Sequence, residues 1–355
     1  MTNVTGGTAL AERPADSVWL SALPTAPRPA VGNALPALRT AAPLERITRP
    51  AEGLLSGLPG AVTDLAVSRD GRHLVAAHYG QDAVSVIDVA TLSVNVTTSG
   101  IAEPYAVSTA DRAYVRSASI AEDSVVAVDL DSGTPLATRE IGVGAQGMAV
   151  SPDGAVLYVA RVNDGAVDIA TIDVESGAVS TIPLTRAADA SIDTVRINRA
   201  GTRLYAALTT ATGGALLIID IRTGQVQTVA VGESIGDIAV DRNDRRIFMT
   251  GWDPEFGGVL RIVDTAAARL VHTIAMGGLP VGLLVTGGAV YVADGEDVVV
   301  IDASTARIVT RTAIGRPVSC LAVSQDGTHL YVGDYEGSVA SLPVRSAGLE
   351  LRTAS

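Results

Sequence analysis

The sequence repeats one phrase, with variation, along most of its length. In one copy, residues 146–160 form an apolar run, a Pro-Asp-Gly turn and a second apolar run. Residues 170–177 then add a third run that ends in Asp and a Ser-Gly turn. Short apolar runs separated by such turns indicate antiparallel β-strands. The phrase returns at 65–71 and at 321–327, so the chain is expected to repeat one small sheet.

The length of the repeat is set by the aspartate that ends its third strand. These aspartates are Asp88, Asp129, Asp173, Asp220, Asp264 and Asp302. Their separations lie between 38 and 47 residues, which is the length of a four-stranded propeller blade. Six repeats can supply a fourth strand. The seventh, which begins at Val318, has too few residues after its third strand to supply one. We therefore predict an all-β, seven-bladed β-propeller of four-stranded antiparallel blades. An N-terminal strand at residues 44–48 is expected to complete the last blade and remove the exposed edges.

The repeats divide the chain into three parts. Residues 44–345 form the predicted propeller, and residues 346–355 form a C-terminal tail. Residues 1–43 are rich in Ala and Pro without strand or helix period, so we predict a flexible arm. Trp19 lies in the bulkiest apolar cluster of this arm. It is either a docking motif for a partner or a side chain that folds back onto the propeller.

Composition narrows the classes of function. All 26 basic residues are arginine, which excludes lysine Schiff bases and a Walker-type phosphate loop. The net charge of −12 repels phosphate backbones, so we expect no nucleic acid partner. No apolar run reaches the roughly 18 residues of a membrane span, so we expect no direct membrane insertion. Cys320 is interpreted as a small core residue.

The N-terminus does not have the composition of a signal peptide. It lacks a basic start followed by an apolar core, since residues 2–11 are small and polar. We therefore expect a cytoplasmic protein, which a partner could hold at the inner membrane.

The repeated phrase resembles that of a known group of propellers. Ala-Val-Ser-Pro-Asp-Gly, followed by Leu-Tyr-Val-Ala and by Ile-Asp-Val with Ser-Gly, resembles the YVTN β-propeller repeat. That repeat occurs in surface-layer proteins and in relatives of the lactonase and WD40-like propellers. The resemblance covers about residues 54–345. It implies the fold and no single activity, because such propellers include hydrolases, electron-transfer relatives and proteins that only bind other proteins.

The repeated polar residues are expected to be structural. Asp-Gly supplies the left-handed backbone that the first hairpin requires. The aspartate after the third strand, as at Asp173 and Asp220, can accept backbone N–H bonds in the turn that follows. Recognition is then left to the irregular loops.

Candidate binding residues lie in the loops that enter the innermost strands and in those that join strands two and three, because propellers usually bind at this face. Trp252 and Phe256 lie in the longest insertion, which breaks the symmetry of the ring. Exposed aromatic residues are enriched among binding anchors. The predicted partner-binding set is Trp252, Phe256, Tyr79, Tyr105, Arg116, Arg161, Arg316, Tyr335 and, from the arm, Trp19.

Two functional hypotheses follow. The first is a non-catalytic scaffold whose acidic loop face binds another protein, as an accessory component of a bacterial cell-envelope assembly or a membrane-embedded complex. It requires no cofactor and no metal. The second is a lactonase-like hydrolase at the channel mouth that uses His78, Arg161 and Glu233, with or without a divalent metal. We favour the first, because the sequence contains no G-x-S-x-G elbow, no H-E-x-x-H and no paired cysteines.

Overall fold

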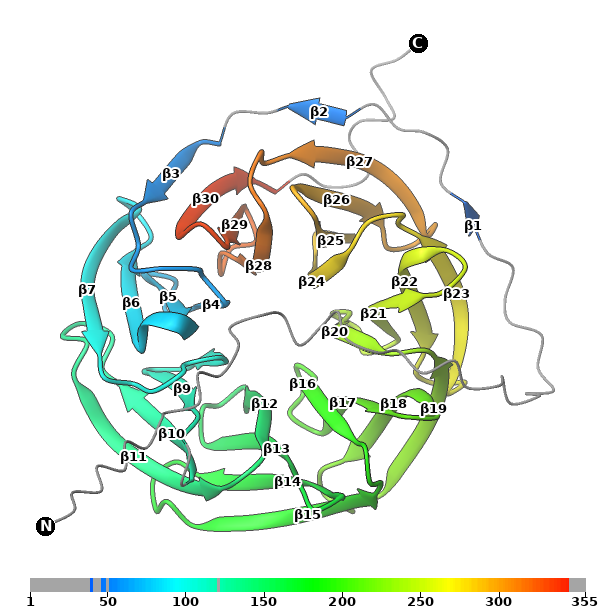
Figure 1. Cartoon of the computed structure of the whole chain (residues 1–355), viewed down its shortest axis with the longest axis horizontal. Helices are drawn as coiled ribbons and strands as arrows, with labels where there is room; N and C mark the ends of the chain where they lie inside the picture. The colour runs from blue at the N-terminus through cyan, green and yellow to red at the C-terminus, as the bar shows by residue number, and fades with distance from the viewer. Residues whose placement is uncertain (1–38, 41–45, 49–50, 120–121, 345–355) are drawn as a thin grey trace, which may run out of the picture. The chain divides into compact units, whose positions relative to one another are not determined.

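Seven β-sheets stand in a ring, with the first strand of each sheet nearest the centre (Figure 1). This computed structural model describes residues 39–40, 46–48, 51–119 and 122–344. The described residues form one compact unit. The predicted all-β, seven-bladed propeller is confirmed.

Each of the first four blades is built from four consecutive strands. Blade one consists of β4 (Asp64–Val67), β5 (His73–His78), β6 (Ala83–Asp88) and β7 (Ser93–Ser99). Blade two consists of β8 (Val107–Thr109), β9 (Ala113–Ser117), β10 (Asp123–Val128) and β11 (Pro135–Gly142). Blade three consists of β12 (Ala145–Val150), β13 (Val156–Asn163), β14 (Ala166–Asp173) and β15 (Val179–Arg186). Blade four consists of β16 (Ser191–Ile197), β17 (Arg203–Thr210), β18 (Gly213–Asp220) and β19 (Val226–Gly232).

The last three blades also receive strands from the N-terminal segment. Blade five consists of β20 (Ile235–Val240), β21 (Arg246–Asp253), β22 (Gly257–Asp264), β23 (Arg269–Ala275) and β1 (Arg39–Thr40). Blade six consists of β24 (Pro280–Thr286), β25 (Ala289–Asp294), β26 (Asp297–Asp302), β27 (Arg307–Ala313) and β2 (Arg46–Thr48). Blade seven consists of β28 (Val318–Val323), β29 (His329–Asp334), β30 (Ser338–Pro343) and β3 (Gly53–Ser56). A short 3-10 helix, η1 (Tyr79–Gln81), joins β5 to β6.

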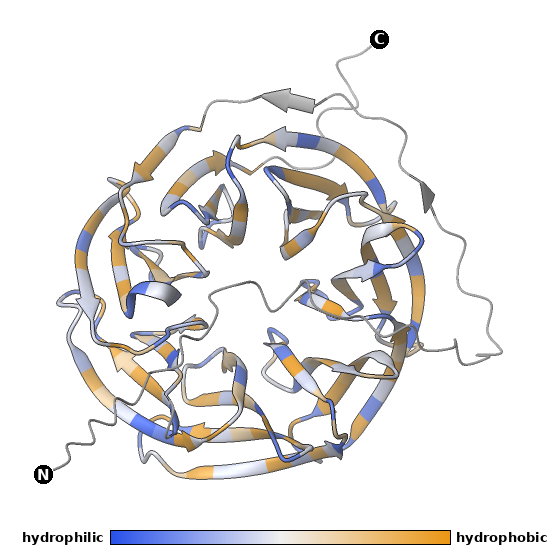
Figure 2. Ribbon diagram, in the orientation of Figure 1, coloured by the Kyte–Doolittle hydropathy of each residue, from blue (hydrophilic) through white to orange (hydrophobic). Residues whose placement is uncertain are grey.

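The apolar core lies between the blades rather than inside any one of them. Seven apolar clusters of described residues fill the seven interfaces, and each draws on two neighbouring blades. Apolar residues recur along the strands of every blade (Figure 2). Strand β5 is buried along its whole length, because it is covered on both faces, whereas the outer strand β11 is mostly exposed. Cys320 belongs to the cluster between blades seven and one, which confirms its interpretation as a core residue.

An N-terminal strand closes the ring, but it is not the predicted one. Strand β3 pairs antiparallel with β30 and completes blade seven, with Gly53 opposite Ser341. The predicted segment, residues 44–48, contributes β2 instead, which pairs parallel with β27 on the outside of blade six. The closing strand must lead directly into β4 of blade one, and residues 53–56 lie close enough in the chain to do so. Sequence pattern missed β3 because only two apolar residues mark it.

The predicted arm and tail lie largely outside the described residues. Of residues 1–43, only Arg39–Thr40 are described, and they form β1, a short strand that was not predicted. Trp19 and residues 346–355 are not described. In the described part of the chain, no helix has the length and hydropathy needed to cross a bilayer.

The aspartates that end the third strands have the predicted structural role. Asp173 Oδ1 accepts the N–H of Ser176 at 2.7 Å and its hydroxyl at 2.6 Å. The same pair of bonds recurs at Asp88, Asp129, Asp220 and Asp302. At Asp173 the Ser176 hydroxyl and N–H stabilise the ionised carboxylate and lower its pKa. These aspartates shape turns and are not available for catalysis.

Candidate functional site

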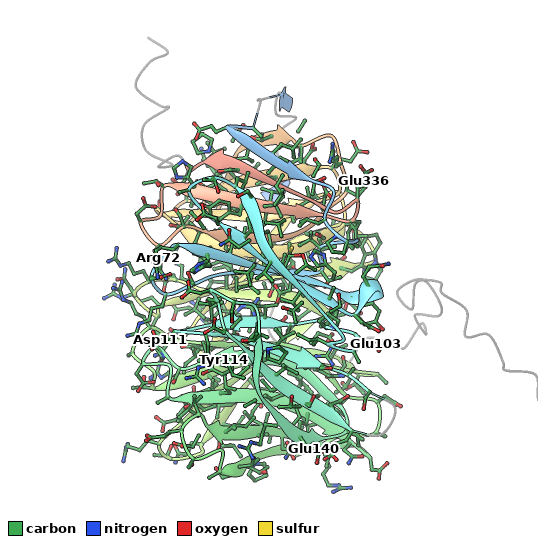
Figure 3. The ribbon with its side chains drawn as sticks, turned by 90° about the vertical axis from the view of Figure 1, so that its left-hand side faces the viewer. Arg72, Glu103, Asp111, Tyr114, Glu140 and Glu336 are labelled. Atoms are coloured by element: carbon green, nitrogen blue, oxygen red, sulfur yellow. The ribbon has the colours of Figure 1, made fainter. Side chains whose placement is uncertain are left out.

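One face of the ring carries the loops in which recognition was expected. We call it the upper face: it comprises the connections from the fourth strand of one blade to the first of the next, and from the second to the third strand within a blade. The lower face comprises the remaining connections. Glu103 and Glu336 lie on the upper face, at the right of the side view in Figure 3, and Arg72 and Asp111 lie on the lower face.

The upper face is strongly acidic. Nine exposed carboxylate residues lie in its described connections: Asp82, Glu103, Glu122, Asp164, Asp189, Glu233, Glu255, Glu296 and Glu336. The arginines beside these carboxylates are fewer: Arg316, partly buried, lies in the connections, and Arg186 is exposed where β15 ends. Clustered charge of one sign raises the local concentration of ligands of the opposite sign. The upper face therefore favours cationic partners.

Exposed aromatic side chains occur on the same face. Among the described residues, the exposed ones are Tyr79 (42%), Tyr105 (39%), Trp252 (39%) and Tyr335 (52%). All four lie in upper-face connections or at a strand end beside one. The remaining tyrosines are buried: Tyr114, Tyr158, Tyr205, Tyr291 and Tyr331. No large apolar side chain is exposed in the described connections of the lower face.

Tyr79, Tyr105 and Arg116 form one packed group, which we call the aromatic cluster. The two rings meet edge to face, with centroids 6.4 Å apart and planes at 84°. Arg116 Cζ lies 5.1 Å from the centroid of the Tyr105 ring, a cation–π arrangement. Arg116 is buried, and its Nη1 donates to the carbonyl of Ala145 at 3.2 Å. The Ala145 carbonyl thus fixes the position of Arg116, and the Arg116 guanidinium in turn holds the Tyr105 ring in place.

The environment of the aromatic cluster keeps the Tyr105 hydroxyl protonated. The Tyr79 hydroxyl donates to Glu103 Oε2 at 3.3 Å. Burial, with the nearby carboxylates of Asp193 and Asp64, raises the pKa of Tyr105 to about 12. The Tyr105 hydroxyl therefore remains a hydrogen-bond donor at every physiological pH.

Carboxylates also lie on the innermost strands, two of which carry Asp at the same repeat position. Asp64 Oδ2 accepts the backbone N–H of Val107 at 2.8 Å, and Asp237 Oδ2 accepts that of Leu283 at 3.1 Å. Each bond joins one blade to the next. The two sites differ because Arg196 Nη2 donates to Asp237 Oδ1 at 2.8 Å.

Asp64 is an unusual carboxylate. Burial raises its pKa to about 6, against the opposing effects of the Val107 N–H and the positive charge of Arg196. Arg196 belongs to β16, which lies across the centre of the ring from β4 (Figure 1). Burial raises the pKa of Asp193, on the same strand β16, as well. Among the described residues, no three His, Cys, Asp or Glu side chains are arranged to hold a metal ion.

The predicted partner-binding residues fall into separate groups. Arg316 is half-buried and lies 3.7 Å from Asp334 Oδ2 and 3.9 Å from Glu336 Oε2, beside Tyr335. Arg161 is engaged inside the fold, since its Nε donates to Asp168 at 2.8 Å and its Nη1 to the carbonyl of Ile141 at 2.9 Å.

Trp252 lies away from the aromatic cluster, on blade five. Its ring packs over Gly257, where an added Cβ would lie 3.8 Å from the ring. Phe256 is partly buried, and its backbone N–H donates to Asp253. Trp252 and Phe256 therefore form a second, smaller apolar site on the upper face.

The structure does not bring together the residues of the hydrolase hypothesis. His78 was expected at the upper face, but it is fully buried. Its Nδ1 lies 3.2 Å from the carbonyl of Gly60 and its Nε2 lies 2.9 Å from Ser85 Oγ. Burial lowers the pKa of His78, which favours the neutral imidazole. Arg161 and Glu233 belong to blades three and four, whereas His78 ends β5 of blade one.

Sequence reasoning missed Asp64 and Asp237, the carboxylates of the innermost strands. Asp64 and Asp237 each precede an apolar run of the same repeat phrase, Leu-Ala-Val and Ile-Ala-Val. Their shared position in the repeat is the sequence pattern that could have identified them. Arg196 carries no such signal, because only the closed ring places its charge near Asp64.

Comparisons with known proteins agree with this architecture. No protein-family model matches the sequence. Seven-bladed beta-propeller protein Rv1057 of Mycobacterium tuberculosis is 28% identical over 326 residues, with 81% of this chain and 83% of the relative covered. A seven-bladed beta-propeller protein of Mycolicibacterium smegmatis is 38% identical over 69 residues, 19% of each chain. The chain is a seven-bladed β-propeller.

A solved structure shares the fold of this propeller. A chain of Kuenenia stuttgartiensis hydrazine synthase superposes with a TM-score of 0.72 at 20% identity, with 81% of this chain and 97% of that chain covered. This likeness concerns the fold alone. The names of the two mycobacterial relatives likewise state an architecture and no activity.

Proposed function

We propose that this propeller is a non-catalytic scaffold whose upper face binds a basic segment of another protein. The observation that carries the proposal is that every exposed aromatic side chain of the described residues lies on one acidic face. Exposed apolar groups rimmed by polar residues mark interaction sites, and here the rings of Tyr79 and Tyr105 meet in one such group. Tyrosine and tryptophan are also the residue types most enriched among binding anchors.

The charge of the face supports a cationic partner. Glu103 and Glu336 are exposed beside Tyr79 and Tyr335, so lysine or arginine side chains could pair with them while their stems pack on the rings. Complementary charge raises the rate of association and selects against acidic partners. Binding should weaken as salt rises, because exposed ion pairs are screened.

The aromatic cluster supports binding because it is already ordered. Tyr105 is held between the Tyr79 ring and the buried guanidinium of Arg116. A partner that binds a fixed ring loses less conformational entropy than one that must order a mobile side chain. A rigid anchor of this kind suits a scaffold.

We extend the proposal to an accessory role in a bacterial cell-envelope assembly, on the cytoplasmic side of the inner membrane. Cytoplasmic loops of membrane proteins carry an excess of Lys and Arg. A membrane-embedded complex would therefore present basic segments of the charge that the upper face favours. The propeller would then be peripheral, held by its partner.

The test is co-purification from the native organism with matched variants. Tyr105→Ala combined with Tyr335→Ala should remove a partner that the unaltered protein retains at low salt. Leu136→Ala combined with Val179→Ala is the control, because these side chains are 50% and 46% exposed on outer strands. Equal recovery of the partner with both double variants would reject the proposal. So would lactone or ester turnover that disappears on His78→Ala.

A further inference from the structure

A groove on the lower face, between blades four and five, departs from the charge pattern of the other blades. Its volume is about 570 Å³, and its lining includes Arg199, Arg203 and Arg242. The groove is distinct from the upper face and from the aromatic cluster. The equivalent turns of the other blades show which residues ordinarily occupy these positions.

The turn between the first and second strands normally carries an aspartate. In blades one, three and seven it is Asp70, Asp153 and Asp326, each of which accepts a serine hydroxyl at 2.5 to 2.6 Å. Hydrogen bonds from the turn lower the pKa of all three carboxyls. The aspartate is thus part of the ordinary structure of the turn.

Blades four and five lack that aspartate but keep an arginine just before its position, as blade one does with Arg69. Ala200 and Asn243 replace it, and the preceding residues are Arg199 and Arg242. The blade-four turn remains ordered, because Asn198 Oδ1 accepts the N–H of Thr202 at 2.8 Å. The blade-four turn has therefore lost a negative charge without losing its shape, whereas the blade-five turn places Arg242 between Asp241 and Asp244, and Asp241 Oδ1 accepts the N–H of Arg245 at 2.7 Å.

The carboxylates of the groove are already occupied by the protein. Asp244 Oδ2 accepts Asn198 Nδ2 at 3.0 Å and lies 3.7 Å from Arg203 Nη1, while Oδ1 accepts the Tyr205 hydroxyl. Asp220 Oδ1 accepts the N–H and hydroxyl of Thr223, each at 2.8 Å. Asp244 joins blade five to blade four and fixes the width of the groove at this point.

Arg199 and Arg242 are not bonded to the carboxylates of the groove, Asp220 and Asp244. Neither makes a hydrogen bond or an ion pair with a described residue, and both are exposed. Two unpaired guanidinium groups on adjacent turns repel each other, and an anion between them removes that repulsion. The planar guanidinium presents its donors in the geometry that phosphate and carboxylate oxygens accept.

We propose that this groove binds a phosphate-type oxyanion, either free phosphate or a phosphate monoester on a peptide. A phosphate monoester carries about two negative charges and three acceptor oxygens, so it can satisfy several arginine donors at once. Recognition of phosphorylated segments by arginine clusters is an established mode of peptide binding. The remainder of the surface, with a net charge of −12 for the chain, would hold such anions weakly.

The test is a calorimetric titration of the full chain at low ionic strength with three probes: inorganic phosphate, a phosphoserine peptide and the same peptide without phosphate. We expect saturable binding of phosphate, of the phosphopeptide, or of both, and none of the unmodified peptide. Tighter binding of the phosphopeptide than of phosphate would identify a peptide as the source of the anion, and equal affinity would identify the free ion.

Arg199→Ala combined with Arg242→Ala should weaken that binding about tenfold or more, since charge-assisted hydrogen bonds are lost. Arg69→Ala is the matched control. Arg69 occupies the same turn position in blade one, where Asp70 follows it and its Nη1 donates to the carbonyl of Asp153 at 3.2 Å. The control should bind as the unaltered chain does, and circular dichroism would confirm that both variants fold. Absence of saturable binding to every phosphate probe, or equal weakening by the control, would overturn the proposal.

Discussion

Replacing Asp64 with Asn should stabilise the propeller at neutral and alkaline pH. The pKa of Asp64 is raised to about 6, mainly by burial. A carboxyl whose pKa is higher in the folded state than in the unfolded state holds its proton more tightly when folded. Its contribution to stability is therefore present at low pH and is lost as pH rises through about 6.

The size of the effect follows from the shift in pKa. Raising a carboxyl pKa from 3.8 to about 6 corresponds to about 3 kcal/mol of free energy at high pH. Asp64 keeps partial contact with solvent, so this is an upper limit and about 2 kcal/mol is the expected value. Asn resembles the protonated carboxyl in shape and charge. The variant should therefore match the unaltered protein near pH 4 and exceed its stability at pH 8.

The assay is urea denaturation at pH 4, 6 and 8, followed by tryptophan fluorescence, with Asp237→Asn as the control. Asp237 occupies the same repeat position but is ion-paired with Arg196 at 2.8 Å. Its replacement should lower stability at pH 8, because a partly buried ion pair loses one partner. If Asp64→Asn also lowers stability at pH 8, the Asp64 carboxylate is a stabilising partner and the reasoning is refuted.

Three further predictions concern packing, closure and acid. Gly147→Ala should lower the melting temperature by several degrees, because the added Cβ would lie 2.8 to 2.9 Å from the backbone of blade four. Gly80→Ala is the control and should leave the melting temperature unchanged, because no atom lies within 4 Å of its added Cβ. An unchanged melting temperature for Gly147→Ala would contradict the close approach of the blades. Deleting residues 1–57 removes β3 and exposes the edge of β30, so the chain should have a lower melting temperature and should aggregate. Deleting residues 1–38 leaves β3 in place and should preserve cooperative melting. Equal melting of the two truncations would show that β3 does not close the ring. Below about pH 4 the free energy of unfolding should fall, because the pKa of turn carboxyls such as Asp302 is lowered in the folded state and protonation removes their hydrogen bonds. The variant Asp302→Asn should show a smaller fall. Urea midpoints measured from pH 2 to 5 test this.

The number of blades could be predicted from sequence because each repeat carries its own turn signals. Asp173 with Ser176, and the equivalent pairs in other blades, encode local structure that needs no distant partner. The closing strand could not be found in the same way. Its four residues, 53–56, acquire a strand partner only when blade seven arrives beside them, some 280 residues later in the chain.

The candidate site was partly predictable for a similar reason. Tyr79 and Tyr105 were identified because aromatic residues are only 3% of the chain, so those in irregular loops stand out, and Arg116 was identified from its place beside the connection between the second and third strands. His78 was placed wrongly, because the end of a strand covered on both faces resembles the start of a loop. Asp64 and Arg196 were missed because their proximity exists only across the closed ring.

The central claim is that the upper face, and not the rim of the ring, contacts a protein partner. The most direct measurement is photo-crosslinking in the native organism, with the reactive amino acid placed at position 335 or, for comparison, at position 179 on outer strand β15. We expect a discrete adduct from position 335, mapped by mass spectrometry to a Lys- or Arg-rich segment, and none from position 179. An adduct formed from position 179 alone, or equally from both positions, would contradict the account.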